Sequence, residues 1–245
     1  MISPDLSDRV ALVTGSAKGV GRELLLSLAA DGAAVAVHYR TSDDAAREVA
    51  ERARAEGVRA TTVRADVTDP EDVDALFDAV EDDLGTVDVL VNNVGAFAPR
   101  HWEALDYGTW RTVMQTNLDG TYLCSRRALD PMRARSYGRI VNVGYASSEK
   151  GLVSAKNFPY FAAKAGVLMF TRMLAADTQD TDITVNAVSP YVVENSDEFP
   201  EELPRDRPAS LEDMAQAVRF FLEDGSAYIS GQNVEVSGGW LPEKV

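Results

Sequence analysis

A glycine-rich turn near the start of the chain limits what this sequence can fold into more than any other feature. Gly15, Gly19 and Gly21 follow the apolar residues 10–13 and open the amphipathic stretch 20–30. A strand that turns through glycines into a helix leaves free backbone N–H groups at the positive end of the helix dipole, which suits a pyrophosphate. The spacing G-x-x-x-G-x-G therefore indicates a dinucleotide-binding turn, longer than the common G-x-G-x-x-G turn, with a purely structural turn as the alternative.

The rest of the chain alternates short apolar runs with amphipathic stretches. This alternation predicts an α/β fold, a doubly wound (Rossmann) domain whose central parallel sheet of about seven strands carries helices on both faces. Right-handed crossovers place the ligand crevice at the carboxyl ends of the strands. The predicted strands are residues 10–14, 34–38, 60–64, 87–92, 139–143, 183–189 and 233–236, and the predicted helices are residues 20–30, 43–56, 71–84, 107–117, 122–133, 160–176 and 211–221.

Length and hydrophobic content favour one domain over two. The chain has 245 residues, of which 45% are hydrophobic, so it can bury one sizeable core and we expect a single domain over residues 1–245. The one irregular segment, residues 194–208, is acidic and contains three prolines. We interpret this segment as a short flexible lid or surface loop.

The charge balance excludes some classes of partner. A net charge of −15 and an isoelectric point of about 4.5 disfavour nucleic acid and anionic membrane surfaces. With 5 Lys against 19 Arg, the composition resembles that of halophilic proteins from a salt-rich cytoplasm, and an ordinary acidic enzyme is the alternative. There is no apolar run near the roughly 20 residues of a membrane helix and no signal-peptide pattern. Because Cys124 is the single cysteine, we expect a cytoplasmic protein with no internal disulfide, and no metal site is predicted.

A second feature is a tyrosine and a lysine four residues apart. On a helix, Tyr160 and Lys164 share one face. A nearby ammonium group favours phenolate over phenol, so we expect the pKa of Tyr160 to be lowered towards the working pH. Such a phenol can pass a proton to or from a substrate oxygen. The alternative is an accidental pair on an exposed helix.

Four motifs occur in one order along the chain: the glycine turn, Asn92-Asn93-Val94-Gly95, Asn117 and the Tyr160/Lys164 pair. Together they resemble the short-chain dehydrogenase/reductase family, particularly its bacterial-type 3-oxoacyl-thioester reductases. The resemblance covers residues 10–240, and the ending of the chain is also similar to the family's last strand. The motif set is specific for fold and cofactor type but says little about the substrate.

The resemblance implies a role for each matching position. Tyr160 would be the general acid–base that protonates the carbonyl oxygen, and Lys164 would depress the pKa of Tyr160 and hydrogen-bond the nicotinamide ribose. Asn117 would hold a water that links Lys164 to solvent, or else simply satisfy backbone groups at a helix end. The residues expected to bind the cofactor are Gly15, Ser16, Lys18, Gly19, Val20, Gly21, Arg40, Asp66, Val67, Asn93, Gly95, Tyr160, Lys164 and Val193.

The chain departs from the family pattern at two places near the expected substrate. The family usually has a serine just beyond the fifth strand; counting from that strand gives Tyr145, whereas counting back from Tyr160 gives Ser147. We expect a short insertion in this loop and favour Ser147 as the hydroxyl that holds the substrate carbonyl, with the Tyr145 phenol as the alternative. The second departure is Tyr191, where the family commonly has glycine, so its ring either points away or shapes the substrate pocket.

The end of the second predicted strand bears on cofactor choice. An NAD-specific site needs a carboxylate there to accept the ribose hydroxyls, but Tyr39 occupies that place and Arg40 follows it. The Arg40 guanidinium can pair with a 2′-phosphate, and Lys18 adds a second positive charge, unless both are merely solvated surface charges. We therefore predict NADP(H) over NAD(H).

These features predict an NADP(H)-dependent carbonyl reductase whose substrate is a small 3-oxoacyl thioester or similar ketone. One alternative is a pteridine or dihydrofolate reductase of the same family, which the sequence after the second strand also resembles. Another is a catalytically silent protein that senses a dinucleotide. By analogy with the family we expect a homo-oligomer, a dimer or tetramer, with residues 122–133 and 160–176 at the interface.

Overall fold

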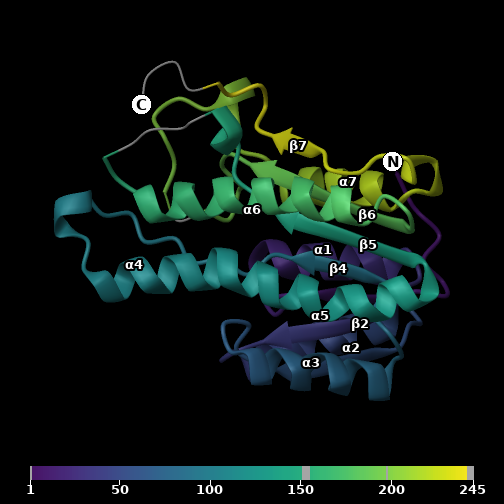
Figure 1. Cartoon of the computed structure of the whole chain (residues 1–245). Helices are drawn as coiled ribbons and strands as arrows, with labels where there is room; N and C mark the ends of the chain where they lie inside the picture. The colour runs from purple at the N-terminus through teal and green to yellow at the C-terminus, as the bar shows by residue number, and fades with distance from the viewer. Residues whose placement is uncertain (1, 151–154, 197, 242–245) are drawn as a thin grey trace.

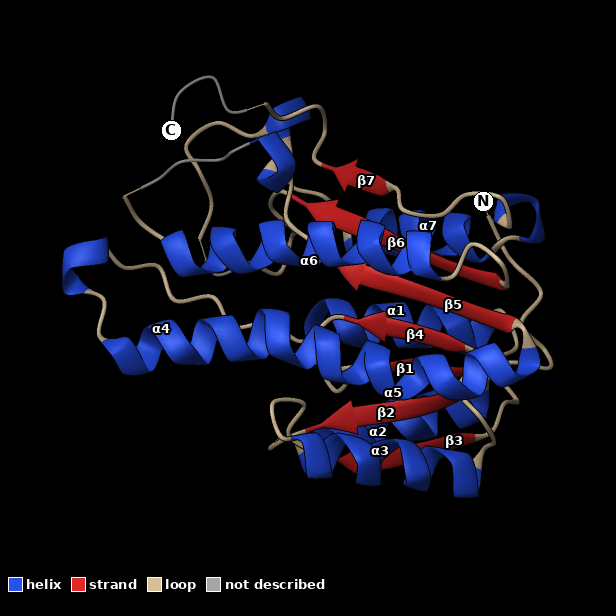
Figure 2. Ribbon diagram, in the orientation of Figure 1, coloured by secondary structure: helices blue, strands red, loops and turns tan. Residues whose placement is uncertain are grey.

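Seven short runs rich in valine and alanine form one parallel sheet in the computed structural model, which describes residues 2–150, 155–196 and 198–241. Figure 2 shows the strands side by side with helices in front and behind. The strands are β1 (Val10–Val13), β2 (Ala34–Tyr39), β3 (Ala60–Arg64), β4 (Val89–Asn92), β5 (Tyr137–Val143), β6 (Asp182–Pro190) and β7 (Asn233–Val236). Their order in the sheet is β3-β2-β1-β4-β5-β6-β7, so the chain winds outwards from β1 in both directions. The predicted doubly wound parallel sheet is confirmed.

The helices cover both faces of this sheet (Figure 1). They are α1 (Gly19–Ala30), α2 (Asp43–Ala55), α3 (Pro70–Asp83), α4 (Tyr107–Met114), α5 (Gly120–Arg135), α6 (Phe158–Asp177) and α7 (Leu211–Leu222). One buried cluster joins α1, α2 and α7 to the sheet through side chains such as Leu24 and Met214. A second cluster on the other face joins α3, α5 and α6 through side chains such as Phe77, Met132 and Leu174. Two closed cores therefore hold the strand ends in fixed positions.

One helix boundary differs from the prediction. Residues 107–117 and 122–133 were expected to form two separate helices, but α4 and α5 run on from one another through the π-helical turn Gln115–Asp119 (Figure 1). A π-turn inserts an extra residue into the helical ladder and is frequent at functional sites. It turns the side chain of Asn117 inwards, where that residue is fully buried.

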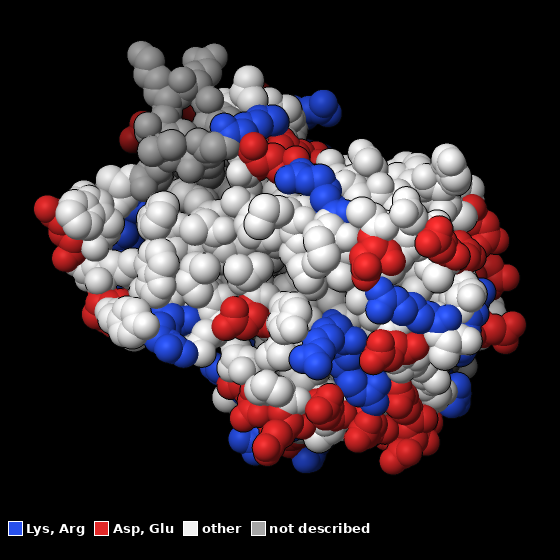
Figure 3. Space-filling model, in the orientation of Figure 1, with Lys and Arg blue, Asp and Glu red and all other residues white. Residues whose placement is uncertain are grey.

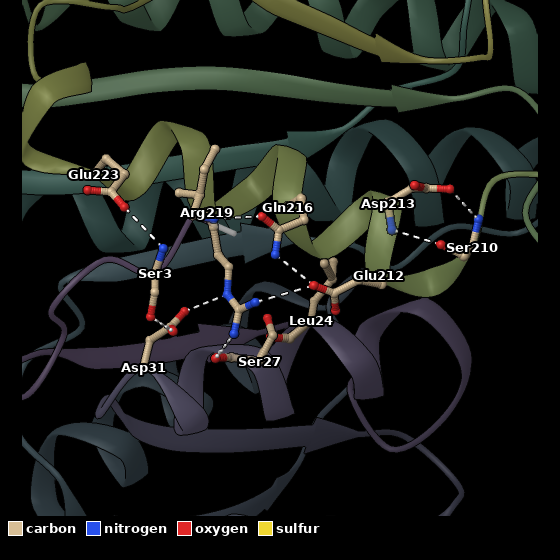
Figure 4. A network of polar contacts seen from close by, with 11 residues as sticks. Ser3, Leu24, Ser27, Asp31, Ser210, Glu212, Asp213, Gln216, Arg219 and Glu223 are labelled. Atoms are coloured by element: carbon tan, nitrogen blue, oxygen red, sulfur yellow. Dashed lines mark hydrogen bonds and ion pairs between the residues drawn. The ribbon is translucent and has the colours of Figure 1, made fainter.

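A buried ion pair fastens α7 to the C-terminal end of α1 (Figure 4). The Arg219 side chain donates from Nε to Asp31 Oδ2 over 2.6 Å and from Nη2 to the backbone oxygen of Ser27 over 3.1 Å. Ser3 donates its hydroxyl to the other oxygen of Asp31. Because each buried charge has several partners, the network holds the two helices in place without an uncompensated charge.

The charges are distributed unevenly over the surface. On the face in Figure 3, acidic side chains gather at the lower edge over α2 and α3, whereas the area over α6 is largely uncharged. Two apolar side chains of α6, Met169 and Met173, are exposed. Within the described ranges, no helix has both the length and the apolar character needed to cross a membrane.

The segment 194–208, expected to be a lid or loop, lacks a long regular element in its described part, which omits residue 197. It contains the 3-10 turn Pro204–Asp206, and Val193 just before it forms an isolated β-bridge with Ala209 just after it. The bridge closes the segment at its base, beside the carboxyl ends of β6 and β7. Its flexibility stays a prediction.

Candidate active site

The glycine turn lies at the carboxyl end of β1 and leads into α1. Gly15 and Gly19 have φ angles of +68° and +58°, which side chains rarely adopt, and a Cβ on Gly21 would lie 2.5 Å from the backbone oxygen of Gly15. The helix begins at Gly19, and the side chain of its N-cap residue, Lys18, makes no capping hydrogen bond. The first N–H groups of α1 therefore have no side-chain cap, and this end of the helix can receive an anion.

A buried histidine that the sequence analysis did not select holds this turn. The backbone N–H of Gly15 donates to His38 Nδ1 over 2.8 Å, and His38 Nε2 lies 3.1 Å from the backbone oxygen of Ala65. Since Nδ1 accepts, Nε2 carries the proton and donates to Ala65. Burial lowers the pKa of His38 to about 4, so the imidazole is neutral near pH 7. The signal that could have found it is a polar residue inside the otherwise apolar strand β2.

The expected cofactor-binding residues Arg40 and Asp66 lie against one another. Arg40 Nη1 is 3.2 Å from Asp66 Oδ2, and the other oxygen of Asp66 accepts hydrogen bonds from the N–H and hydroxyl of Thr68. Partial burial acts to raise the pKa of Asp66, but the hydrogen bonds from Thr68 and Arg40 hold it below its ordinary value. The exposed side chain of Arg40, which directly follows β2, therefore stands beside an ionised carboxylate.

Tyr160 and Lys164 lie one turn apart at the start of α6, beside the end of β5. Lys164 Nζ donates to the backbone oxygen of Val143 over 2.7 Å and lies 5.7 Å from the centre of the Tyr160 ring. Burial lowers the pKa of Lys164 to about 8. Burial also raises the pKa of Tyr160, with a further contribution from Tyr145, so the expected lowering is not found in this structure. The surrounding aromatic rings desolvate the phenolate more than the ammonium at this distance stabilises it.

Asn117 and Gly95 complete the group around Lys164. Asn117 Nδ2 donates to the backbone oxygens of Ala96 and Val113 over 2.8 and 2.9 Å. Its Oδ1 is buried and has no hydrogen-bond partner among the described residues. A Cβ on Gly95 would lie 2.4 Å from this oxygen and 3.5 Å from Lys164 Nζ. The structure therefore brings Gly95, Asn117 and Lys164 together, with an acceptor available for water.

Asn93 and Val67 hold the neighbouring strand ends. Asn93 Nδ2 donates to the backbone oxygen of Thr14, and its N–H to the Thr14 hydroxyl, both over 2.9 Å, which ties the end of β4 to the end of β1. Val67 is buried, and a Cβ on Gly120 at the start of α5 would come within 2.9 Å of its side chain. Asn93 therefore lies at the carboxyl ends of β1 and β4, where the chain connections of a doubly wound sheet turn away in opposite directions, and Val67 packs against the start of α5.

The loop after β5 presents Tyr145, and not Ser147, towards Tyr160. Ser147 is fully buried, has a φ of +62° and donates its N–H to Glu235 Oε1 over 2.9 Å. The Tyr145 ring lies 5.6 Å from the Tyr160 ring at an interplanar angle of 75°. This differs from the expectation that Ser147 reaches the substrate, because the bond to β7 turns its backbone, and with it the hydroxyl, into the protein.

A cavity of about 800 Å³ opens in front of Tyr160. Tyr191 and Val193 line it, and the Tyr191 ring lies edge-on to the ring of Tyr145, another lining residue, with centres 6.4 Å apart, which favours a Tyr191 ring that shapes the cavity. Further along the same segment, a Cβ on Gly19 would lie 2.9 Å from Asn195 Nδ2. Asn195 therefore borders both the cavity and the glycine turn. The sequence analysis missed it, because nothing in an irregular segment shows which residue folds back onto α1.

The doubly wound sheet, its reversal of strand order at β1 and β4, and the glycine turn before α1 define a dinucleotide-type α/β protein. The model of the family described as short chain dehydrogenase matches residues 9–204. The chain belongs to the short-chain dehydrogenase/reductase family and is an oxidoreductase of that type.

The proteins to which this chain is similar in sequence and structure are consistent with membership of this family. The 3-oxoacyl-[acyl-carrier-protein] reductase FabG of Staphylococcus aureus is 36% identical over 239 residues, which cover 94% of this chain and 96% of that protein. The corresponding reductase of Synechocystis is 35% identical over 96% of this chain and 98% of its own length. A putative short-chain alcohol dehydrogenase from Sinorhizobium meliloti has a similar structure, with a TM-score of 0.89, 33% identity and coverage of 96% and 97%. The acetoin dehydrogenase YohF of Salmonella typhimurium has a TM-score of 0.87 and 30% identity, with coverage of 97% and 98%.

Proposed function

We propose that this protein reduces a carbonyl group to an alcohol with NADPH, on a 3-oxoacyl thioester or a similar ketone. The observation that carries the proposal is the convergence of Tyr160, Lys164, Asn117 and Gly95 beside the cavity. A proton donor, a buried ammonium and an unpartnered acceptor at one place make up a proton-delivery site.

The residues present fit a nicotinamide dinucleotide. Gly21 allows the turn to close tightly, because a Cβ there would lie 2.5 Å from the backbone oxygen of Gly15, and the uncapped N–H groups of α1 suit a pyrophosphate. Ser16 and Val20 belong to the same turn, and Asn93, Gly95 and Val193 would lie beside the nicotinamide. A bound nicotinamide would supply the hydride.

The side chains of this protein would supply the proton and the orientation. Tyr160 donates the proton from its hydroxyl to the carbonyl oxygen as negative charge develops there. Lys164 keeps a positive charge close to the phenolate that remains, and Val143 fixes its position through the hydrogen bond to Nζ. A water accepted by Asn117 Oδ1 would return a proton from solvent. Tyr145, which borders the cavity, is placed to hold the substrate oxygen in the role first expected of Ser147.

The preference for NADP(H) over NAD(H) rests on Arg40 and Lys18, both exposed beside the glycine turn. The Arg40 guanidinium would pair with the 2′-phosphate, and its contact with Asp66 keeps it near the adenosine end of the crevice. Val67 and Asp66 would lie against the adenine.

A second candidate function is the reduction of a pteridine ring, which the aromatic lining of the cavity favours. A purely sensing role does not account for a buried lysine beside a tyrosine at the cavity, since sensing needs no acid–base group. Assays with acetoacetyl thioester and dihydrobiopterin, each with NADPH, separate the two enzymatic candidates.

The surface of the protein bears on the medium in which it works and on its oligomeric state. The net charge of −15 supports a halophilic, cytoplasmic protein, whose stability would rise from low to molar KCl. The exposed methionines of α6 and the half-exposed Tyr122 of α5 support a homo-oligomer, a dimer or tetramer, which light scattering at high salt would measure.

The test follows NADPH absorbance over a panel of ketones with the unaltered protein and with Tyr160→Phe. We expect the variant to lose about 100- to 10,000-fold in turnover, because it lacks the proton donor, while NADPH binding stays within a few fold. Lys164→Met is a second variant that should also lose turnover. If Tyr160→Phe reduced ketones as fast as the unaltered protein, the proposed function would be wrong.

A further inference from the structure

Two aromatic rings stand nearly perpendicular to the Tyr160 ring at the cavity. Phe97, from the segment after β4, has its ring centre 5.1 Å away at an angle of 78°. Tyr145, from the loop after β5, lies 5.6 Å away at 75°. Both rings line the cavity, so the phenol that would donate the proton lies between apolar surfaces that are flat and stiff.

A third ring, Tyr191, is held in place from behind. It stacks on Trp240 with ring centres 3.8 Å apart and an angle of 8°, and Tyr145 packs edge-on against both rings. These three side chains, called the aromatic wall below, come from the end of β5, the end of β6 and the segment after β7. Because the stack fixes the plane of Tyr191, the two wall residues that line the cavity, Tyr145 and Tyr191, are held in place before a substrate binds.

The described lining of this cavity has no cation that would bind a phosphorylated carrier; Arg205 and Arg207 line the neighbouring cavity, which shares Tyr191 and Val192. Among its described lining residues, Glu198 is the one charged side chain, and no Lys or Arg is present. Phosphate groups are recognised by arginine, lysine or free helix N–H groups. The net charge of −15 adds long-range repulsion against an anionic substrate.

We propose, on the basis of the carbonyl reduction argued above, that the aromatic wall selects a ketone attached to a flat, uncharged aromatic ring, in preference to an open-chain acyl thioester on a phosphorylated carrier. The ring packs against Tyr145 and Tyr191, and its carbonyl oxygen faces Tyr160. The reaction adds a hydride to the carbonyl carbon and a proton to the oxygen, so the ketone becomes a secondary alcohol and NADPH becomes NADP⁺. Tyr145 and Tyr191 are then the residues that determine specificity.

The experiment compares kcat/KM with NADPH for three carbonyl compounds: acetophenone, 2-octanone with the same number of carbons, and acetoacetyl-CoA as the phosphorylated thioester. We expect acetophenone to be preferred over 2-octanone by about tenfold or more, since each well-placed ring pair adds to simple area burial. Acetoacetyl-CoA should be the poorest of the three. The preference should appear mainly in KM, because Tyr191, stacked on Trp240, would bind the ring without touching the reacting atoms.

Tyr191→Leu tests the wall, because leucine keeps apolar volume but removes the flat face. It should lower the ratio of kcat/KM for acetophenone to kcat/KM for 2-octanone severalfold. Trp240→Leu, which removes the stacking partner and leaves the lining ring, should give a smaller loss in the same direction. Tyr228→Leu is the matched control, since Tyr228 is fully exposed, and it should leave the preference unchanged. Thermal melting of each variant shows that it is folded.

Equal kcat/KM for acetophenone and 2-octanone, or a clear advantage for acetoacetyl-CoA, would overturn the inference and leave the proposed carbonyl reduction standing. An unchanged preference in folded Tyr191→Leu would also overturn it. If no carbonyl compound were reduced, the proposed function itself would fail, and turnover of dihydrobiopterin alone would favour the pteridine candidate over both.

Discussion

The two ends of the crevice are built in different ways. The cofactor end, around the glycine turn, comes mainly from the first 67 residues of the chain, and several of its contacts use a backbone group, such as the N–H of Gly15 that donates to the His38 ring. The substrate end takes Phe97, Tyr145, Tyr160 and Tyr191 from four separate segments, and its contacts are between side chains. The first end follows the pattern of the family, whereas the second departs from it.

This difference indicates which part of the molecule is free to change. A pyrophosphate requires backbone N–H groups at fixed places. The glycines allow the turn that exposes these groups, and the buried imidazole of His38 holds the turn in position. A substrate pocket needs only suitable side chains on the loops at the carboxyl ends of the strands. The cofactor end should therefore respond to changes that disturb the backbone, and the substrate end to changes in individual side chains.

The largest expected effect is an acid sensitivity at the cofactor end. The pKa of His38 in the folded protein, about 4, lies below the ordinary value of 6.5, so its contribution to stability is complete above pH 6.5 and is lost as the pH falls towards 4. Between these pH values His38 is protonated in the unfolded chain but stays neutral in the folded protein, so acid favours unfolding. The free energy of unfolding should fall by up to about 3 kcal/mol from this residue alone.

Urea unfolding between pH 7 and pH 4.5 measures this loss in the unaltered protein and in His38→Asn, which does not titrate. The carboxylates contribute equally to both proteins, so the difference between the two pH profiles isolates the histidine. Parallel profiles would show that the glycine turn does not depend on a neutral imidazole.

The next effect concerns cofactor choice at the same end. Arg40→Asp should reduce the kcat/KM preference for NADPH over NADH by about 10- to 100-fold, because it removes a charged hydrogen-bond donor and places a second carboxylate near Asp66. Arg52→Asp, an exposed change of equal charge on α2, should leave the preference as it is. A preference of the unaltered protein for NADH would contradict the assignment.

The smallest expected effect shows whether the hydroxyl of Ser147 or that of Tyr145 binds the substrate oxygen. Ser147→Ala should leave kcat/KM within about twofold, since its hydroxyl is buried away from the cavity, whereas Tyr145→Phe should lower it severalfold by removing a hydrogen bond to the substrate oxygen. Initial rates over a range of concentrations of one ketone, at saturating NADPH, give kcat/KM for each variant. The reverse result would show that the loop after β5 adopts another arrangement during catalysis.

The amino-acid sequence by itself determined the parallel sheet, the glycine turn and the shared helix face of Tyr160 and Lys164. These follow from local properties: the spacing of apolar residues, the positive φ that Gly15 and Gly19 tolerate, and the helical repeat. The sign of the pKa change at Tyr160 does not follow from them, because it depends on rings that lie far away in the chain.

Only the tertiary structure decided that Tyr145 faces the cavity while Ser147 is buried, and that Arg40 pairs with Asp66. It also decided that Asn117 sits in a π-turn next to Gly95. Each of these arrangements depends on a partner distant in sequence, such as Glu235 for Ser147. Local patterns fix the backbone conformation of a segment, but the direction of a side chain in a loop is set by whatever the rest of the chain packs against it.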